Sequence, residues 1–213
     1  GDILYRDASG LARLAAGTSG QVLQTGGSGA NPSWGTVSSE VVKLATGTFS
    51  TSASHLNLDN YFDDTTYNSY TVKFSTQNTN SSGNTIRFRW RSGGSELSAG
   101  AYYYTANIAY GNSAGNSNGT TRGWGHDHVA IGHFGNDNSE RTIGEINLFS
   151  PTDSTGRPGG IYHCFGKDGG SQFSTWKGGF MYNGAHTIDG FALYCPSGNF
   201  TDAGFWTLYG EKK

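Results

Sequence analysis

Apolar and polar residues alternate along much of this chain, which is the pattern of β-strands that bury one face. In the segment TIRFRWRSG, Ile86, Phe88 and Trp90 alternate with three arginines. Residues 69–77, SYTVKFSTQ, show the same two-residue period. No segment shows the 3.6-residue period of an amphipathic helix. The pattern therefore predicts an all-β protein.

Strand-like segments continue to the end of the chain at even spacing, separated by Gly and Asn. They include HVAIGHF, RTIGEINLFSP, IYHCFGK, STWKGGFMYN and TIDGFALYC. Many short strands joined by turns are typical of an antiparallel β-sandwich, and we expect a jelly-roll-like one. Residues 111–125, GNSAGNSNGTTRGWG, have no such alternation, and their Gly, Asn and Ser content predicts a long loop.

The first stretch of the chain has a different character, because its apolar runs are very short and are separated by Gly, Ser and Thr. We expect tiny strands joined by tight turns, closed by Trp34, that bury too little surface to be stable alone. The sequence thus predicts a small β module over residues 1–37 and a β-sandwich over residues 38–213. We expect the module to associate with other chains through Leu4, Tyr5, Leu14, Leu23 and Trp34.

Composition supports the β interpretation and argues against several functions. The 213 residues include 34 Gly, more than twice the usual share, and only 14% are charged. A net charge of −2 argues against a nucleic-acid partner, which requires a basic surface. No apolar run approaches the roughly 20 residues of a membrane-spanning helix. Cys164 and Cys195 lie in apolar, aromatic segments and are expected to be buried free thiols.

The opening segments GDILY, GLARL and GTSGQVL, with the Gly-rich link before PSW, carry a resemblance to a known family. Residues 1–36 resemble the recurrent segment of tailed-bacteriophage fibre and other virion-appendage proteins. The ending GNFTDAGFWTLYGEKK resembles the closing strand of marine-phage fibre and virion β domains. The resemblance implies a homotrimer that assembles in the host cytoplasm and joins other proteins of the virion. It also implies a longer protein, because the opening resembles an internal repeat.

The function implied by the resemblance is that of a non-enzymatic appendage subunit, with a tail fibre favoured. Its sandwich is expected to recognise a host-surface glycan or an outer-membrane component. A head-decoration or scaffold protein that acts only through protein attachment is the alternative, and a polysaccharide depolymerase is the third. Aromatic planes beside short polar side chains suit sugars, although most aromatics are expected in the core. The candidate ligand contacts are Trp124, Tyr103, Asn116, Asn118 and Arg122.

His126 and His128 are a candidate metal site, because residues two apart on a strand point to the same face. The resemblance implies one arrangement, in which a His-x-His pair from each of three chains holds an iron on a threefold axis. Six imidazoles suit octahedral geometry. The alternative is two histidines at the surface or in a subunit interface, and no other cofactor is expected.

Three further patterns have simpler explanations. Residues 111–115 match the hydrolase pattern G-x-S-x-G, but the residues that follow do not favour a helix, which the pattern requires. The segments LDNYFDDTTY and 136–140 cluster oxygen ligands without the spacing of a calcium loop, so solvated turns are expected. Arg87, Arg89 and Arg91 are expected on a solvated strand face, with an anion site as the alternative.

Overall fold

The computed structural model of the chain describes residues 1–78, 84–112, 114–134, 140–152, 156–167, 172–184, 186–200 and 204–213. The chain forms two compact units, Gly1–Glu40 and Val41–Lys213. They divide close to the predicted boundary between residues 37 and 38. The structure is all-β, with no helix among the described residues, which confirms the predicted class. The described part accordingly contains no helix long and apolar enough to cross a membrane.

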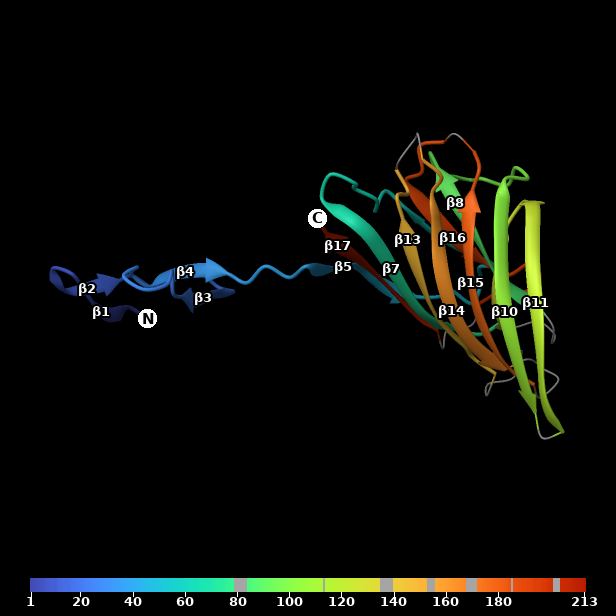
Figure 1. The fold of residues 1–213 in the computed structure, drawn as a ribbon, viewed down its shortest axis with the longest axis horizontal. Coiled ribbons are helices and arrows are strands. Elements are labelled where there is room, and N and C mark those ends of the chain that lie inside the picture. The colour runs from blue at the N-terminus through green and yellow to red at the C-terminus, as the bar shows by residue number, and fades with distance from the viewer. Residues whose placement is uncertain are drawn as a thin grey trace. The chain divides into compact units, whose positions relative to one another are not determined.

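Two hairpins make up the first unit (Figure 1). Their strands are β1 (Ile3–Asp7) with β2 (Gly10–Leu14), and β3 (Gln21–Gln24) with β4 (Ser33–Thr36). In the second hairpin Leu23 lies opposite Trp34. The indole Nε1 of Trp34 donates a hydrogen bond of 2.6 Å to the carbonyl oxygen of Ala15, which ties this hairpin to the segment that follows β2.

The first unit has no core of its own. Tyr5 and Leu14 are half-buried on one face of the first hairpin, while Leu4 and Leu11 stand on the other face, 73% and 83% exposed. None of residues 1–40 is fully buried. Apolar side chains therefore remain in water on both hairpins.

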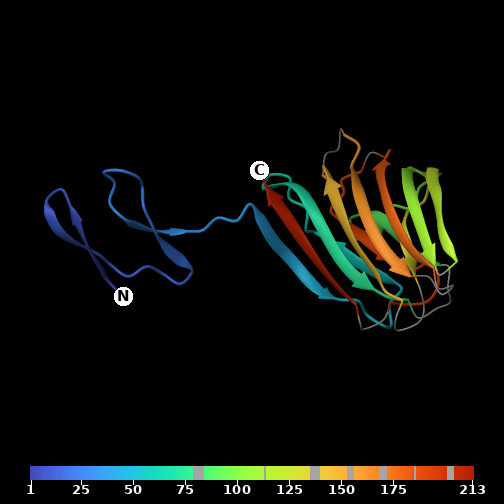
Figure 2. The same ribbon diagram turned by 60° about the horizontal axis from the view of Figure 1, so that its bottom comes forward.

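The second unit consists of two antiparallel sheets (Figure 2). The large sheet has the order β11-β10-β15-β14-β13-β7-β17-β5, and the small sheet has the order β12-β8-β16-β6, with β9 beside β8. The strands of the large sheet are β5 (Val41–Thr48), β7 (Tyr67–Thr76), β10 (Tyr102–Asn112), β11 (Gly115–His126), β13 (Thr142–Phe149), β14 (Gly159–Lys167), β15 (Phe173–Tyr182) and β17 (Phe205–Lys212). Those of the small sheet are β6 (His55–Asp59), β8 (Asn84–Ser92), β9 (Ser95–Glu96), β12 (Val129–Phe134) and β16 (Gly190–Tyr194).

The core lies between the small sheet and one face of the large sheet. Phe88 of β8 is completely buried, and its ring centroid lies 4.8 Å from that of Phe180 on β15. Inward residues alternate with outward ones on both sheets, for example Tyr70, Val72 and Phe74 along β7. The predicted β-sandwich is confirmed, whereas this strand order does not show a jelly roll.

The loop predicted for residues 111–125 is wrong, because β10 and β11 form a long hairpin there. β11 lacks the alternating signal since the positions that face inward are small or polar. Its neighbour β10 supplies the apolar cover instead: the ring of Tyr104 lies where a side chain at Gly123 would be, and the ring of Tyr110 borders Gly119. An aromatic residue that covers a cross-strand glycine is a known way to stabilise an edge strand.

The two cysteines are free and buried, as predicted. Burial raises the pKa of Cys195 to about 12 and raises the pKa of Cys164 even further above its usual value. Because the thiolate is the reactive form of cysteine, both side chains behave as apolar core residues.

Two of the three arginines of β8, Arg89 and Arg91, are not solvated, which corrects the sequence prediction for them. Arg91 is 6% exposed, and its Nε lies 2.6 Å from Oδ1 of Asp59. Arg89 forms ion pairs with Glu96, at 3.0 Å, and with Asp127. Each of these two guanidinium groups already has carboxylate partners, so neither is available for an external anion.

Replacing Phe88 by Ala is expected to lower the free energy of unfolding by about 3–5 kcal/mol, because a fully buried ring between the two sheets is lost. The control is Phe205→Ala, which removes a half-exposed ring from the outer face and is expected to cost less than about 1 kcal/mol. Urea titration of the full chain, followed by tryptophan fluorescence, measures both values. Equal losses would contradict the position of Phe88 in the core.

Candidate functional site

The outer face of the large sheet, which points away from the small sheet, carries the candidate site. Because all neighbouring strands are antiparallel and in regular register over this region, the outward residues form rows across the sheet. One row runs Trp124, Tyr103, Met181 and Gly159, from β11 to β14. The next row runs Arg122, Thr105, Gly179 and Ile161.

These two rows enclose a groove of about 860 Å³, which we call the aromatic groove. Its outward-facing residues are Tyr103, Thr105, Arg122, Trp124, Ile161, Gly179 and Met181. The Trp124 side chain is 84% exposed, the highest value among the exposed large apolar residues. The ring of Tyr103 meets it edge-on, with the centroids 4.9 Å apart and an interplanar angle of 86°. This contact packs the indole against Tyr103 in the lining of the groove.

Gly179 forms part of the floor of the aromatic groove, between Thr105 and Ile161. A Cβ added at Gly179 would lie 3.5 Å from the nearest backbone oxygen and 3.7 Å from Ile161, both ordinary contacts. Its neighbour Gly178 differs, since a Cβ there would overlap Tyr162 and the Thr105 carbonyl oxygen. Packing therefore requires Gly178 but not Gly179. A glycine in a strand without a packing reason often marks a place where a ligand approaches closely.

The structure brings the predicted ligand contacts to a single face. Tyr103, Arg122 and Trp124 line the aromatic groove, and Asn118 lines an adjacent hollow on the same strands. Asn116 lies near the far end of β11 and is exposed. Sequence analysis missed Gly179, Ile161 and Met181, because only the register of β14 and β15 shows that they face Trp124.

His126 and His128 do not share a strand face as predicted. β11 ends at His126, and a bulge at Gly125, where φ is 69°, places His126 opposite the inward-facing Tyr102. The two imidazole rings still lie 5.9 Å apart. No group of three or more His, Cys, Asp or Glu side chains arranged to hold a metal occurs in the described part of the chain. An iron shared by three chains stays a prediction.

His128 belongs to the charged cluster beside the small sheet. Its Nδ1 lies 2.6 Å from Oδ1 of Asp127, and Asp127 also pairs with Arg89. Burial lowers the pKa of His128, and the positive charges of Arg87 and Arg89 act in the same direction, while Asp127 opposes them. Burial alone would raise the pKa of Asp127, but its hydrogen bond to His128 and the charge of Arg89 lower it. Within the cluster the carboxylate of Asp127 is shared between His128 and Arg89, so the charges of these side chains largely offset one another.

The remaining sequence candidates are occupied or lie outside the described residues. Ser113 of the G-x-S-x-G match and residues 136–139 of the second oxygen cluster are in the latter group. Asp59 pairs with Arg91, as described above. Asp63 accepts hydrogen bonds from Thr65 and Thr66 within a turn, which lower its pKa. The turn predicted for this segment is therefore present.

Comparison with protein families, curated proteins and solved structures finds no match to this chain.

Replacing His128 by Gln is expected to reduce the loss of stability on acidification. Because the pKa of His128 is lowered in the folded protein, the unfolded chain takes up the proton first, and stability falls as the pH drops through about 6.5. His128→Gln removes that contribution, whereas His163→Gln, an exposed control on the outer face, does not. Urea titrations at pH 7.5 and pH 5.5 measure the difference. Identical losses in the wild type and His128→Gln would contradict the assignment.

Proposed function

We propose that this chain is a non-enzymatic subunit of a tailed-phage virion appendage, with a tail fibre as the favoured form. In this proposal the sandwich recognises a glycan or other component of the host surface through the aromatic groove. The proposal rests on one observation: a highly exposed tryptophan stands beside a glycine-floored groove on a solvent-facing sheet. The resemblance of residues 1–36 to fibre segments supplies the context.

The chemistry of the aromatic groove suits a sugar ring. One face of a pyranose carries C–H bonds, which pack on the face of an indole such as that of Trp124. The hydroxyl groups at the ring edge then need hydrogen-bond partners, and the guanidinium of Arg122 and the hydroxyl of Thr105 stand in the neighbouring row. The volume of about 860 Å³ is within the usual range for a ligand site.

The residues around the aromatic groove favour binding over hydrolysis. Glycosidases use two carboxyl groups about 5–9.5 Å apart on either side of the scissile bond. Strands β10, β11 and β15 contain no Asp or Glu. The outward carboxylate on β13 is Glu145, in the row next to that of Arg122. Its Oε2 lies 3.5 Å from Nζ of Lys73. These observations support a lectin-like role.

Trimerisation is part of the same proposal. The exposed Leu4 and Leu11 and the absence of a core in residues 1–40 support association of the first unit with copies of itself. Three grooves that engage one cell surface would gain avidity, which compensates for weak binding at each site.

A second candidate function, attachment to another protein, is favoured by a different part of the outer face. One row of the outer face carries the exposed apolar side chains Phe165 on β14, Ile143 on β13 and, beyond Ser75 of β7, Phe205 on β17. Clustered exposed apolar residues are characteristic of protein contacts. This row is separate from the aromatic groove, so the two functions are compatible.

The full chain is expected to sediment at three times the 22.6 kDa mass of one chain. The double variant Leu4→Ser/Leu11→Ser is expected to weaken the trimer, because it removes apolar side chains that would be buried between chains. Val37→Ser is the matched control, since Val37 is exposed but lies outside both hairpins. Sedimentation equilibrium measures the masses. A monomeric wild-type chain, or a trimer unaffected by the double variant, would contradict this part of the proposal.

Recognition can be tested on a printed array of bacterial capsular polysaccharides and lipopolysaccharide O-antigens. The wild type is expected to bind a subset of them. Trp124→Ala is expected to weaken binding at least tenfold, through the lost stacking surface, and Gly179→Val is expected to do the same by filling the floor. Phe205→Ala, a comparable truncation elsewhere on the outer face, is the control. No binding on the array, or binding that both variants retain, would overturn the recognition role.

A further inference from the structure

We propose that the ligand of the outer face is an acidic polysaccharide, whose anionic groups are held by Arg122 and Lys177 in two consecutive subsites. The inference rests on the proposed function and specifies the class of glycan that it binds. It adds to the aromatic groove a second subsite, of which the sequence indicated only Asn118.

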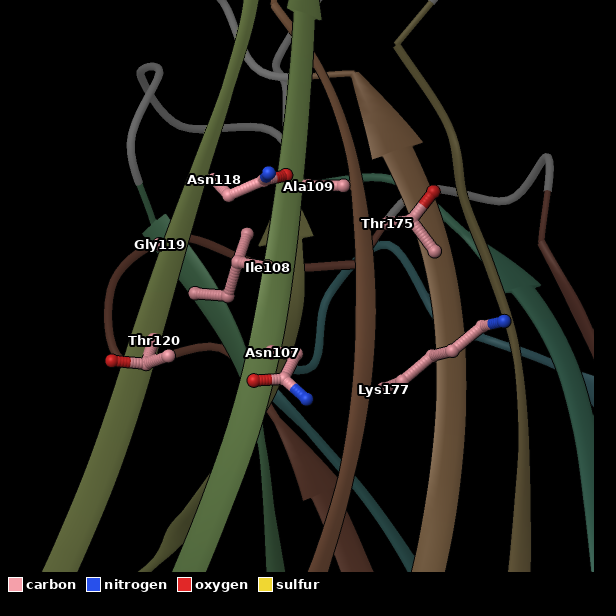
Figure 3. A pocket seen from close by; sticks show the side chains of 8 residues that line it. All are labelled: Asn107, Ile108, Ala109, Asn118, Gly119, Thr120, Thr175 and Lys177. Carbon is pink, nitrogen blue, oxygen red and sulfur yellow. The ribbon is translucent and has the colours of Figure 1, made fainter.

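The second subsite is a hollow of about 790 Å³ on the same three strands, which we call the polar hollow (Figure 3). Its lining is contributed by β10, β11 and β15, and the side chains are mostly amides, hydroxyls and an amine. The residues are Asn107, Ile108, Ala109, Asn118, Gly119, Thr120, Thr175 and Lys177. Short amides and hydroxyls around a cation are suited to a ligand that carries both hydroxyl groups and negative charge.

The polar hollow continues directly from the aromatic groove. On β10 the outward residue after Thr105 is Asn107, and on β15 Lys177 is the outward neighbour of Gly179. Outward neighbours on a strand are about 7 Å apart, so the two hollows occupy successive pairs of rows on the sheet. A chain of sugar rings that lies along the strands passes from one hollow to the other.

The charge distribution on these strands is one-sided. The only charged side chains on β10, β11 and β15, apart from the terminal His126, are Arg122 and Lys177, and both are exposed. Among the described residues neither forms an ion pair. The whole chain, in contrast, has a net charge of −2. An uncompensated positive field on part of a slightly acidic protein attracts anions.

The neighbouring strands in the described part of the chain do not cancel this charge. The row of Lys177 continues to His163 on β14 and then to Glu145 on β13. Glu145 is already in contact with Lys73, and it also accepts a hydrogen bond of 3.3 Å from Asn147. Four other cationic side chains of the sandwich differ from Arg122 and Lys177, because each forms an ion pair with a carboxylate. These pairs are Lys73 with Glu145, Arg89 with Glu96 and Asp127, Arg91 with Asp59, and Lys167 with Glu140.

The separation of the two cations points to a polymer. Arg122 and Lys177 lie on strands two positions apart, about 10 Å across the sheet, and in successive rows. A single small anion contacts both groups only if the two long side chains converge over β10, whereas extended side chains leave their charges apart. A polysaccharide with a carboxylate, sulfate or phosphate on its repeating unit presents charges at intervals and can contact both. Arg122 can hold a planar carboxylate with two hydrogen bonds, whereas Lys177 acts as a point charge.

The test uses the polysaccharides that bind the wild-type chain on the array, each in its native form and after chemical neutralisation. Carboxyl reduction, desulfation and dephosphorylation are the three arms, and they identify which anion is recognised. Biolayer interferometry with the full chain measures the affinities. Neutralisation is expected to weaken binding at least tenfold, and raising the salt concentration is expected to weaken binding of the native form only.

Lys177→Gln and Arg122→Gln are each expected to weaken binding of the native polysaccharide about three- to tenfold, and to leave binding of the neutralised form unchanged. Lys43→Gln is the matched control, because Lys43 is exposed at the opposite edge of the sheet in the same row as Arg122. Its affinity is expected to stay within about twofold of the wild type. Equal binding of native and neutralised forms, or full affinity in both variants, would overturn this inference while leaving glycan recognition in place. No binding by the wild-type chain to any polysaccharide would overturn the proposed function itself.

Discussion

The structure depends on the fact that the small sheet covers only one face of the large sheet. Because successive side chains of a strand point to opposite faces, every strand of the large sheet contributes alternate residues to the core and to the outer face. Phe180 and Met181 illustrate the division, since they are adjacent on β15 and face opposite ways. The eight strands pair side by side, so their outward residues line up in rows across the sheet. The residue types in each row then determine the chemistry of that part of the outer surface. The aromatic groove and the polar hollow each span two such rows.

The sequence predicted the parts of the fold where burial imposes alternation. β7 and β8 were predictable because each carries three large apolar side chains to the core at every second position. β11 was not predictable in the same way, because its inward positions are small or polar and Tyr104 and Tyr110 of β10 cover its glycines. In the structure β11 is an edge strand of the large sheet, and its outward residues are exposed to solvent. Trp124 is one of these residues.

The candidate site was predictable only in part. Trp124 was identified by its contrast with the polar segment around it, and Tyr103 and Arg122 by their chemistry. Gly179 and Lys177 have no local signal, and only the register of β15 against β10 brings them beside the others. The arginines of β8 show the opposite case: their spacing resembled an anion site, but the carboxylates that neutralise them come from segments distant in the sequence, such as Asp59 and Asp127. The lack of a core in the first unit was predictable from the sequence alone, because residues 1–40 have too few apolar residues to form one.

The central claim, that the outer face holds a glycan across the aromatic groove, is tested most directly by a crystal structure of the chain with an oligosaccharide cut from a polysaccharide that it binds. The account predicts a sugar ring stacked on the indole of Trp124 and lying over Gly179, with the oligosaccharide continuing toward Lys177. An oligosaccharide bound elsewhere, for example at the charged cluster around Arg89 or on the small sheet, would contradict it.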